Sequence, residues 1–197
     1  MNITKGIVTM LAAAALTGAS AAEKSIVVYF SHTGENYAVG NITEGNTAKV
    51  AKVIAAKTGS ELYEIKEAQP YPVEYQACVE LAKRELRSGA RPAIKGELPD
   101  LKEYSVIYLG YPNWWGDAPM VVYSFLEKAK IDGKTIIPFC THEGSGLGST
   151  AHKLAKAVPN AKVEQNGLSL RGVTAQRDAA ATEKAVAEWL KTLGNVN

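Results

Sequence analysis

The sequence predicts an α/β fold in which helices cover both faces of a parallel β-sheet. Three continuous apolar runs, at residues 25–30, 105–110 and 134–140, are typical of strands that are buried on both sides. Segments with apolar residues at helical spacing lie between these runs. Strands that alternate with helices form right-handed crossovers, and such crossovers build a parallel sheet.

The first half of the chain contains two predicted strands and two predicted helices. In order, they are a strand at 25–30, a helix at 48–56, a short strand at 62–65 and a helix at 73–88. Asn46 or Thr47 is a fitting N-cap for the first helix, and Gly59 is typical of a helix end. A polar turn at 31–36 and an insertion at 37–44 separate the first strand from the first helix.

The second half continues this alternation. In order, it contains a strand at 105–110, a helix at 120–126, a strand at 134–140, a helix at 149–158, an interrupted strand within 162–171 and an amphipathic helix at 174–193. No linker divides residues 22–197, which indicates one domain. Five such strands fit a three-layer sandwich with the doubly wound strand order 2-1-3-4-5 and helices on both faces.

The first 21 residues have the pattern of a secretory signal peptide. Lys5 is the only charge before Glu23, residues 7–16 are apolar, and Ala19 and Ala21 form an Ala-x-Ala cleavage site. The apolar run is too short for a membrane span. We expect Sec-type export, cleavage near Ala21, and a periplasmic or secreted protein without stable membrane insertion. The alternative is an uncleaved extension on a cytoplasmic protein.

Composition and residue spacing exclude several classes of function. A net charge of +2 is too small to indicate a nucleic-acid-binding surface. The three histidines lack the spacing of a metal site, so no metal is expected.

Cys78 and Cys140 could pair in an oxidising compartment, but one lies in a predicted helix and the other ends a predicted strand. We favour two separate buried thiols.

Two adjacent tryptophans, Trp114 and Trp115, lie in a loop at 111–119 that follows the strand at 105–110. In open α/β sheets, ligands bind at the carboxyl ends of the strands. An indole at this place offers a flat face to a flat ligand; the alternative is that both rings pack under the loop. Because adjacent side chains of an extended segment point to opposite sides, we expect one ring to stack and the other to pack, with Trp114 favoured for the ligand.

The loops after strands one, three and four are neighbours in the order 2-1-3-4-5, so we expect them to converge. The first loop carries hydroxyls and amides ahead of a helix N-terminus, which favours a phosphate. No Lys or Arg occurs from Ser31 to Ala48, so amides, hydroxyls and the helix dipole would balance its charge. The third loop, at 141–148, is glycine-rich and lets backbone amides approach a ligand closely. Together, the three loops suit flavin mononucleotide (FMN).

Four motifs together carry a resemblance to a known family. They are FSHTGEN at 30–36, GNT at 45–47, LGYPNWWG at 109–116 and PFCTHEGSG at 138–146. The combination resembles bacterial flavodoxin-like proteins, and most closely the branch with a Tyr-Pro-x-Trp-Trp loop. The resemblance runs from about Ser25 to Gly172. It implies a flavodoxin fold, bound FMN and redox chemistry.

The resemblance also implies cofactor-binding residues in each loop. Ser31, Thr33, Asn46 and Thr47 would hold the phosphate, with His32 in the same loop; Pro112, Asn113, Trp114, Trp115 and Gly116 would flank the isoalloxazine ring; and Thr141, His142, Glu143, Gly144, Ser145 and Gly146 would line its other edge. The chain departs from ordinary flavodoxins because the insertion at 37–44 splits the phosphate loop, which leaves Thr33 and Thr47 as alternative phosphate ligands. It also lacks a Tyr in the third loop and the strong acidity of the family.

The sequence therefore predicts an exported FMN protein that transfers electrons, without a catalytic side chain of its own. Its partner would be a redox protein or a small-molecule electron donor or acceptor, and it would be a monomer or a homodimer. The alternatives are an NAD(P)H-dependent FMN or quinone reductase on the same fold, and a flavin-binding module without redox turnover. Asp117 and Glu143 are expected to be solvated loop charges.

Overall fold

The computed structural model describes residues 24–194, so the predicted signal peptide at 1–21 lies outside the described residues. The main sheet contains β1 (Ser25–Tyr29), β4 (Glu61–Glu64), β5 (Val106–Pro112), β6 (Thr135–His142), β7 (Lys162–Val163) and β8 (Leu168–Arg171). All pairs are parallel, in the order β4-β1-β5-β6-β7, with β8 also on β6. Because β7 and β8 pair with successive parts of β6, they form one interrupted strand. The predicted order 2-1-3-4-5 is therefore confirmed.

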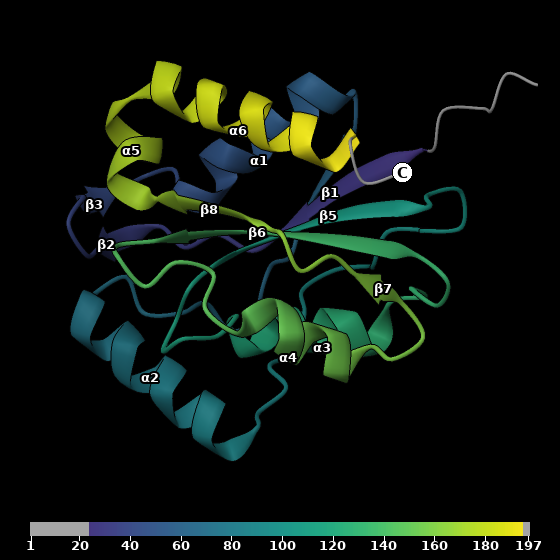
Figure 1. The fold of residues 1–197 in the computed structure, drawn as a ribbon. Helices are drawn as coiled ribbons and strands as arrows, with labels where there is room; N and C mark the ends of the chain where they lie inside the picture. The colour runs from purple at the N-terminus through teal and green to yellow at the C-terminus, as the bar shows by residue number, and fades with distance from the viewer. Residues whose placement is uncertain (1–23, 195–197) are drawn as a thin grey trace, which may run out of the picture.

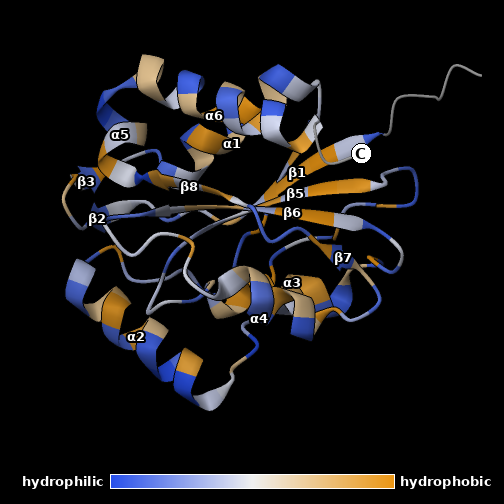
Figure 2. Cartoon of the chain, in the orientation of Figure 1, coloured by the Kyte–Doolittle hydropathy of each residue, from blue (hydrophilic) through white to orange (hydrophobic). Residues whose placement is uncertain are grey.

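Helices cover both faces of this sheet and complete three layers (Figure 1). On one face lie α1 (Asn46–Thr58), α5 (Gly172–Arg177) and α6 (Ala179–Gly194), and on the other lie α2 (Tyr75–Ser88), α3 (Met120–Lys128) and α4 (Thr150–Ala157). Alternate strand residues enter two separate cores: Val27 packs with residues of α1 and α6, and Val28 packs with residues of α3. Apolar residues accordingly concentrate in the central strands (Figure 2).

The start of α1 differs from the predicted boundary. Its N-cap is Gly45, rather than Asn46 or Thr47, and no side chain of the cap residue takes part. Instead, the backbone N–H of Ala48 donates to the hydroxyl of Ser31 in the preceding loop (3.0 Å). A Cβ at position 45 would collide with that hydroxyl, so glycine is required where the loop crosses the helix end.

The predicted helix at 174–193 is two helices, α5 and α6. Asp178 has φ −138° and ψ 86°, which ends α5. Its carboxylate then accepts a hydrogen bond from the backbone N–H of Ala181 (2.9 Å) in the first turn of α6. An Asp that can bond to nearby backbone competes with helix continuation, and this explains the break.

The insertion forms most of a small antiparallel hairpin, β2 (Gly34–Asn36) and β3 (Gly40–Ile42). The hairpin lies at the edge of the sheet where β1 ends, next to α2 (Figure 1). The backbone N–H of Glu35 donates to the carbonyl of Val73 (2.7 Å) just before α2. Gly34 has φ +89°, and a Cβ there would lie 2.7 Å from the same carbonyl oxygen, so a side chain is excluded.

Cys78 and Cys140 are buried and unpaired, which confirms two separate thiols. Between residues 24 and 194, no helix is long and apolar enough to cross a membrane. In the same range, no group of three or more His, Cys, Asp or Glu residues is placed to hold a metal ion.

Candidate functional site

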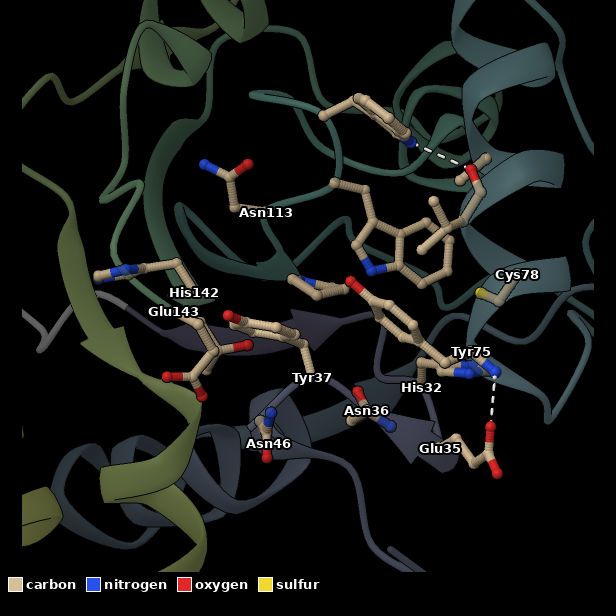
Figure 3. Close-up of a pocket in the computed structure, with 16 residues that line it drawn as sticks. His32, Glu35, Asn36, Tyr37, Asn46, Tyr75, Cys78, Asn113, His142 and Glu143 are labelled. Carbon is tan, nitrogen blue, oxygen red and sulfur yellow. Dashed lines mark hydrogen bonds between the residues drawn. The ribbon is translucent and has the colours of Figure 1, made fainter. Parts of the chain in front are cut away.

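A cavity of about 320 Å³ lies at the carboxyl ends of β1, β5 and β6, where the three predicted loops converge (Figure 3). Nine of the predicted site residues line it: His32, Asn46, Pro112, Asn113, Trp114, Trp115, Thr141, His142 and Glu143. The strand order reverses between β1 and β5, and this is the place where doubly wound proteins bind ligands.

The other predicted site residues do not line the cavity. They are Ser31, Thr33, Thr47, Gly116, Gly144, Ser145 and Gly146. Ser31 caps α1, as described above. The hydroxyl of Thr47 is buried and bonded to the hydroxyl of Thr141 (2.8 Å), whereas Thr33 is exposed. Thr33 and Thr47, the two alternative phosphate ligands, therefore have different environments. Only Thr47 lies in α1, the helix whose first residue lines the cavity.

Seven further residues line the cavity and were not predicted from the sequence. Glu35, Asn36 and Tyr37 come from the hairpin, and Tyr75, Cys78, Val79 and Ala82 come from α2. The exposed tyrosine inside the insertion was the one available signal for the hairpin. The amphipathic pattern of α2 predicted that one face of the helix is buried. It could not show that residues of this helix also line the cavity.

The tryptophan loop ends in a tight two-residue turn. Trp114 and Asp117 exchange two backbone hydrogen bonds (2.8 and 3.1 Å), with Trp115 at φ 57° and Gly116 at φ 76° between them. Positive φ at both central positions is the pattern of a type I′ turn. This conformation costs a bulky residue such as Trp115 conformational energy, and such strain is found where function requires it.

The two indoles have different environments. Trp114 makes edge-to-face contacts with Phe30 (5.6 Å between centroids) and Tyr71 (4.9 Å), and it packs against the core. Trp115 is 49% exposed. Its indole N–H donates to the carbonyl of Val79 in α2 (3.0 Å), and the ammonium of Lys83 lies 4.8 Å from the ring centroid. Trp114 is thus held by packing, and Trp115 by polar contacts at the surface.

Asp117 is buried, so the expectation of a solvated loop charge is wrong at this position. One carboxylate oxygen accepts hydrogen bonds from the hydroxyl of Tyr123 (2.7 Å) and the N–H of Ala118 (2.8 Å). The other pairs with the ammonium of Lys153 in α4 (2.9 Å), which also donates to the carbonyl of Gly116 (3.1 Å). This network fixes the tryptophan loop to α3 and α4.

Asn113 joins the second loop to the third. Its side-chain N–H donates to the carbonyl of Gly146 (2.8 Å), and its side-chain oxygen accepts from the N–H of Gly116 (3.0 Å). Its backbone N–H donates to the carbonyl of Thr141 (2.8 Å). Two of these bonds reach the third loop and the other lies within the second, so Asn113 fixes the relative position of the two loops.

Glu143 is also not a solvated charge, because its side chain is only 12% exposed. One carboxylate oxygen accepts from the backbone N–H of Val173 (2.7 Å), and the other lies 3.4 Å from the guanidinium of Arg171. The neighbouring His142 accepts a hydrogen bond at Nδ1 from the N–H of Gly144 (2.8 Å). Because Nδ1 accepts this bond, the neutral ring carries its proton on Nε2, and burial, which lowers the pKa of His142, favours that neutral form.

Two buried polar atoms of residues that line the cavity have no partner within the protein: Nε2 of His32 and Oδ1 of Asn46. A buried polar atom without a hydrogen bond costs free energy, so these atoms favour a ligand or water that completes them. Burial also lowers the pKa of His32, which keeps its ring neutral at pH 7. The lining residues include no Lys or Arg. The lining of the cavity therefore offers indoles, neutral polar groups and the carboxylates of Glu35 and Glu143, without a cation.

This fold and cavity define a doubly wound α/β protein with a ligand site at its switch point. A family model described as flavodoxin matches residues 24–193, and the chain therefore belongs to the flavodoxin family. No match was found among curated proteins.

Solved structures show the same fold. A Bacteroides eggerthii protein assigned as a flavoprotein is 31% identical, with a TM-score of 0.68 over 87% of this chain and 98% of that chain. A Bacteroides uniformis protein with the same assignment is 29% identical, with a TM-score of 0.69 over 86% and 98%. A Lactobacillus acidophilus flavoprotein in complex with FMN is 20% identical, with a TM-score of 0.59 over 78% and 95%; this likeness shows the fold alone.

We expect Lys153→Met to destabilise the protein, because it leaves the buried carboxylate of Asp117 without its cation. The expected loss in the free energy of unfolding is about 1–3 kcal/mol, measured by urea denaturation. Lys184→Met is the control, since Lys184 forms an exposed pair with Glu188 (4.0 Å) and such pairs contribute about 0–1 kcal/mol. Equal losses in the two variants would contradict the proposed anchoring of the loop.

Proposed function

We propose that this protein binds FMN non-covalently and transfers electrons. The observation that carries the proposal is one cavity at the switch point that combines two tryptophans with buried, unpaired polar atoms of His32 and Asn46. A flavin nucleotide has a flat ring system at one end and hydrogen-bonding groups along its length. Bound FMN would supply the redox chemistry, while the protein orients it and sets its potential. Family membership and the FMN-bound relative support this assignment.

The phosphate end of the ligand is assigned to the first turn of α1. A helix N-terminus leaves backbone N–H groups free of intrahelical partners, and its dipole favours an anion. Asn46 at the start of α1 lines the cavity. Since the cavity lining has no Lys or Arg, neutral donors and the helix dipole must carry phosphate binding.

The flat end of the ligand is assigned to the tryptophan loop, with Trp115 as the stacking ring. The sequence favoured Trp114 for this role, but Trp114 already packs against Phe30 and Tyr71. Trp115 is about half exposed, borders the cavity and is held in a strained turn. This assignment gives the strained conformation a role, because the turn presents the Trp115 indole at the cavity.

FMN should bind more tightly than riboflavin, since riboflavin lacks the phosphate that α1 would hold. Several hydrogen bonds of about 0.5–1.5 kcal/mol each are lost, so at least a tenfold difference in dissociation constant is expected. FAD should also bind more weakly, because the sequence has no Gly-x-Gly-x-x-Gly fingerprint of dinucleotide binding. Quenching of flavin fluorescence by the apo-protein measures all three. Equal affinities for FMN and riboflavin would disprove the phosphate assignment.

The redox part of the proposal is tested on the FMN-loaded protein. Anaerobic dithionite titration, followed by absorbance, should bleach the flavin reversibly. A flavin that cannot be reduced and reoxidised would disprove electron transfer and leave a binding module. Direct bleaching of the flavin absorbance by NADPH would instead identify the reductase alternative.

Alanine substitutions should separate the roles of the two tryptophans. Trp115→Ala should weaken FMN binding by about 1–3 kcal/mol, as loss of base stacking does elsewhere, with the melting temperature of the apo-protein maintained. Trp114→Ala should destabilise the apo-protein by about 3–5 kcal/mol through loss of packing. Trp115→Phe keeps an aromatic ring and serves as the control. Unchanged FMN affinity in both alanine variants would show that the tryptophan loop is not the flavin site.

Export is proposed from residues 1–21 alone, and flavin would then be acquired after the unfolded chain has crossed the membrane. Inhibition of the Sec translocase should trap a full-length precursor in the cytoplasm. Without inhibition, N-terminal sequencing should find a mature chain that begins near Ala22. Mature, flavin-loaded protein outside the inner membrane despite the block would rule out this route.

A further inference from the structure

Exposed aromatic side chains gather at the cavity. Among the described residues, five large apolar side chains are clearly exposed: Tyr37 (65%), Leu62 (45%), Val73 (69%), Tyr75 (40%) and Trp115 (49%). Three of them, Tyr37, Tyr75 and Trp115, line the cavity, and Val73 precedes α2 in the chain without lining it. Concentrated apolar exposure of this kind marks a surface that is covered when a ligand or partner binds.

The two tyrosines come from different elements but lie together. Their ring centroids are 6.2 Å apart, with an interplanar angle of 31°. In Figure 3, the Tyr37 ring lies across the cavity between Tyr75 on one side and His142 and Glu143 on the other. A planar ligand that entered from the tryptophan loop would therefore meet tyrosine rings on the hairpin side.

The hairpin and α2 hold these rings as one unit. The backbone N–H of Tyr75 donates to the carboxylate of Glu35 (3.0 Å; Figure 3). The backbone N–H of Glu35 in turn donates to the carbonyl of Val73 (2.7 Å). The turn of the hairpin is bonded to α5, because Arg177 donates to the carbonyl of Ala38 (3.3 Å), and Gln176 of α5 donates to the carbonyl of Glu44 (2.7 Å), two residues after the hairpin.

We propose that Tyr37 and Tyr75 form an aromatic cover that packs over the flavin ring at the side of the cavity formed by the hairpin and the start of α2. This inference rests on the proposed FMN site and adds specificity-determining residues to it. Contact with the ring buries apolar tyrosine surface that now faces water. The insertion that interrupts the phosphate loop thereby supplies the ring contact that the third loop lacks.

The charges at this end of the cavity agree with a neutral ring as the covered group. Glu35 lines the cavity beside Tyr75, and no Lys or Arg is among the lining residues. A carboxylate next to the cover disfavours an anionic group there. A second lining carboxylate, that of Glu143, lies near Asn46 and is bonded to the N–H of Val173.

The test uses the full mature protein with Tyr37→Ala, Tyr75→Ala and the double variant. FMN affinity is measured by fluorescence titration, and exposure of bound flavin by iodide quenching. Each single variant should bind FMN about 5- to 150-fold more weakly, the range expected for loss of one stacked ring, and should make bound flavin more accessible to iodide. Tyr37→Phe and Tyr75→Phe keep the rings and should retain wild-type affinity. Val73→Ala changes an exposed residue outside the cavity lining and should behave as wild type.

A second pair of variants tests the link between the hairpin and α2. Glu35→Ala removes the carboxylate that bonds Tyr75, whereas Glu74→Ala removes the N-cap of the same helix, which bonds the N–H of Ala77 (3.1 Å). Both lose a carboxylate at the N-terminus of α2, but only Glu35→Ala should weaken FMN binding and raise iodide quenching.

The outcomes separate this inference from the function on which it rests. Wild-type protein that binds FMN, with Tyr37 and Tyr75 variants that match it in affinity and iodide quenching, would overturn the cover while the FMN assignment stands. The exposed rings would then serve contact with another molecule. Wild-type protein that fails to bind FMN would overturn both. Because both tyrosines are well exposed, thermal melts of the variants should match wild type, and lower affinity then reports a lost ligand contact.

Discussion

The position of β5 between β1 and β6 determines where all three ligand-facing loops meet. β5 pairs with β1 only as far as Gly110, but its pairing with β6 continues to Pro112. The edge of the sheet is therefore stepped, and the cavity lies where β1 stops short. Gly110 is part of this constraint, because it lies against the ring of Phe139 and a Cβ would collide with that ring. The close contact of these two strands sets the spacing of the second and third loops.

The tryptophan loop shows how a strained conformation is maintained. Trp115 adopts a positive φ, which is unfavourable for a bulky side chain. Bonds from Asn113 to the third loop, from Asp117 to α3 and α4, and from the Trp115 indole to α2 hold the turn on three sides. Rigid surroundings of this kind keep a ligand-facing ring in place before the ligand arrives, which reduces the ordering cost of binding.

The polar residues of the site divide into those that build it and those that remain available. The carboxylate of Glu143, Nδ1 of His142 and the hydroxyl of Thr47 each bond within the protein. Nε2 of His32 and Oδ1 of Asn46 remain without a protein partner. The charged residues in the cavity lining are Glu35 and Glu143, and no Lys or Arg lines it. Such a cavity suits a ligand whose reactive part is a neutral ring. The redox potential of such a ligand would depend mainly on burial and on the nearby carboxylates.

The sequence by itself determined the α/β class, because buried strands and amphipathic helices leave periodic patterns that are local in the chain. The strand order and the three converging loops followed from the doubly wound topology that such an alternation fits. It also placed Asn113 and His142 at a cavity that the structure then showed. Only the tertiary structure decided that Asp117 is buried against Lys153, that Trp114 packs while Trp115 faces solvent, and that Tyr37 and Tyr75 meet across the cavity. These features depend on contacts between residues that are distant in sequence or on backbone angles within one turn, and neither produces a periodic signal.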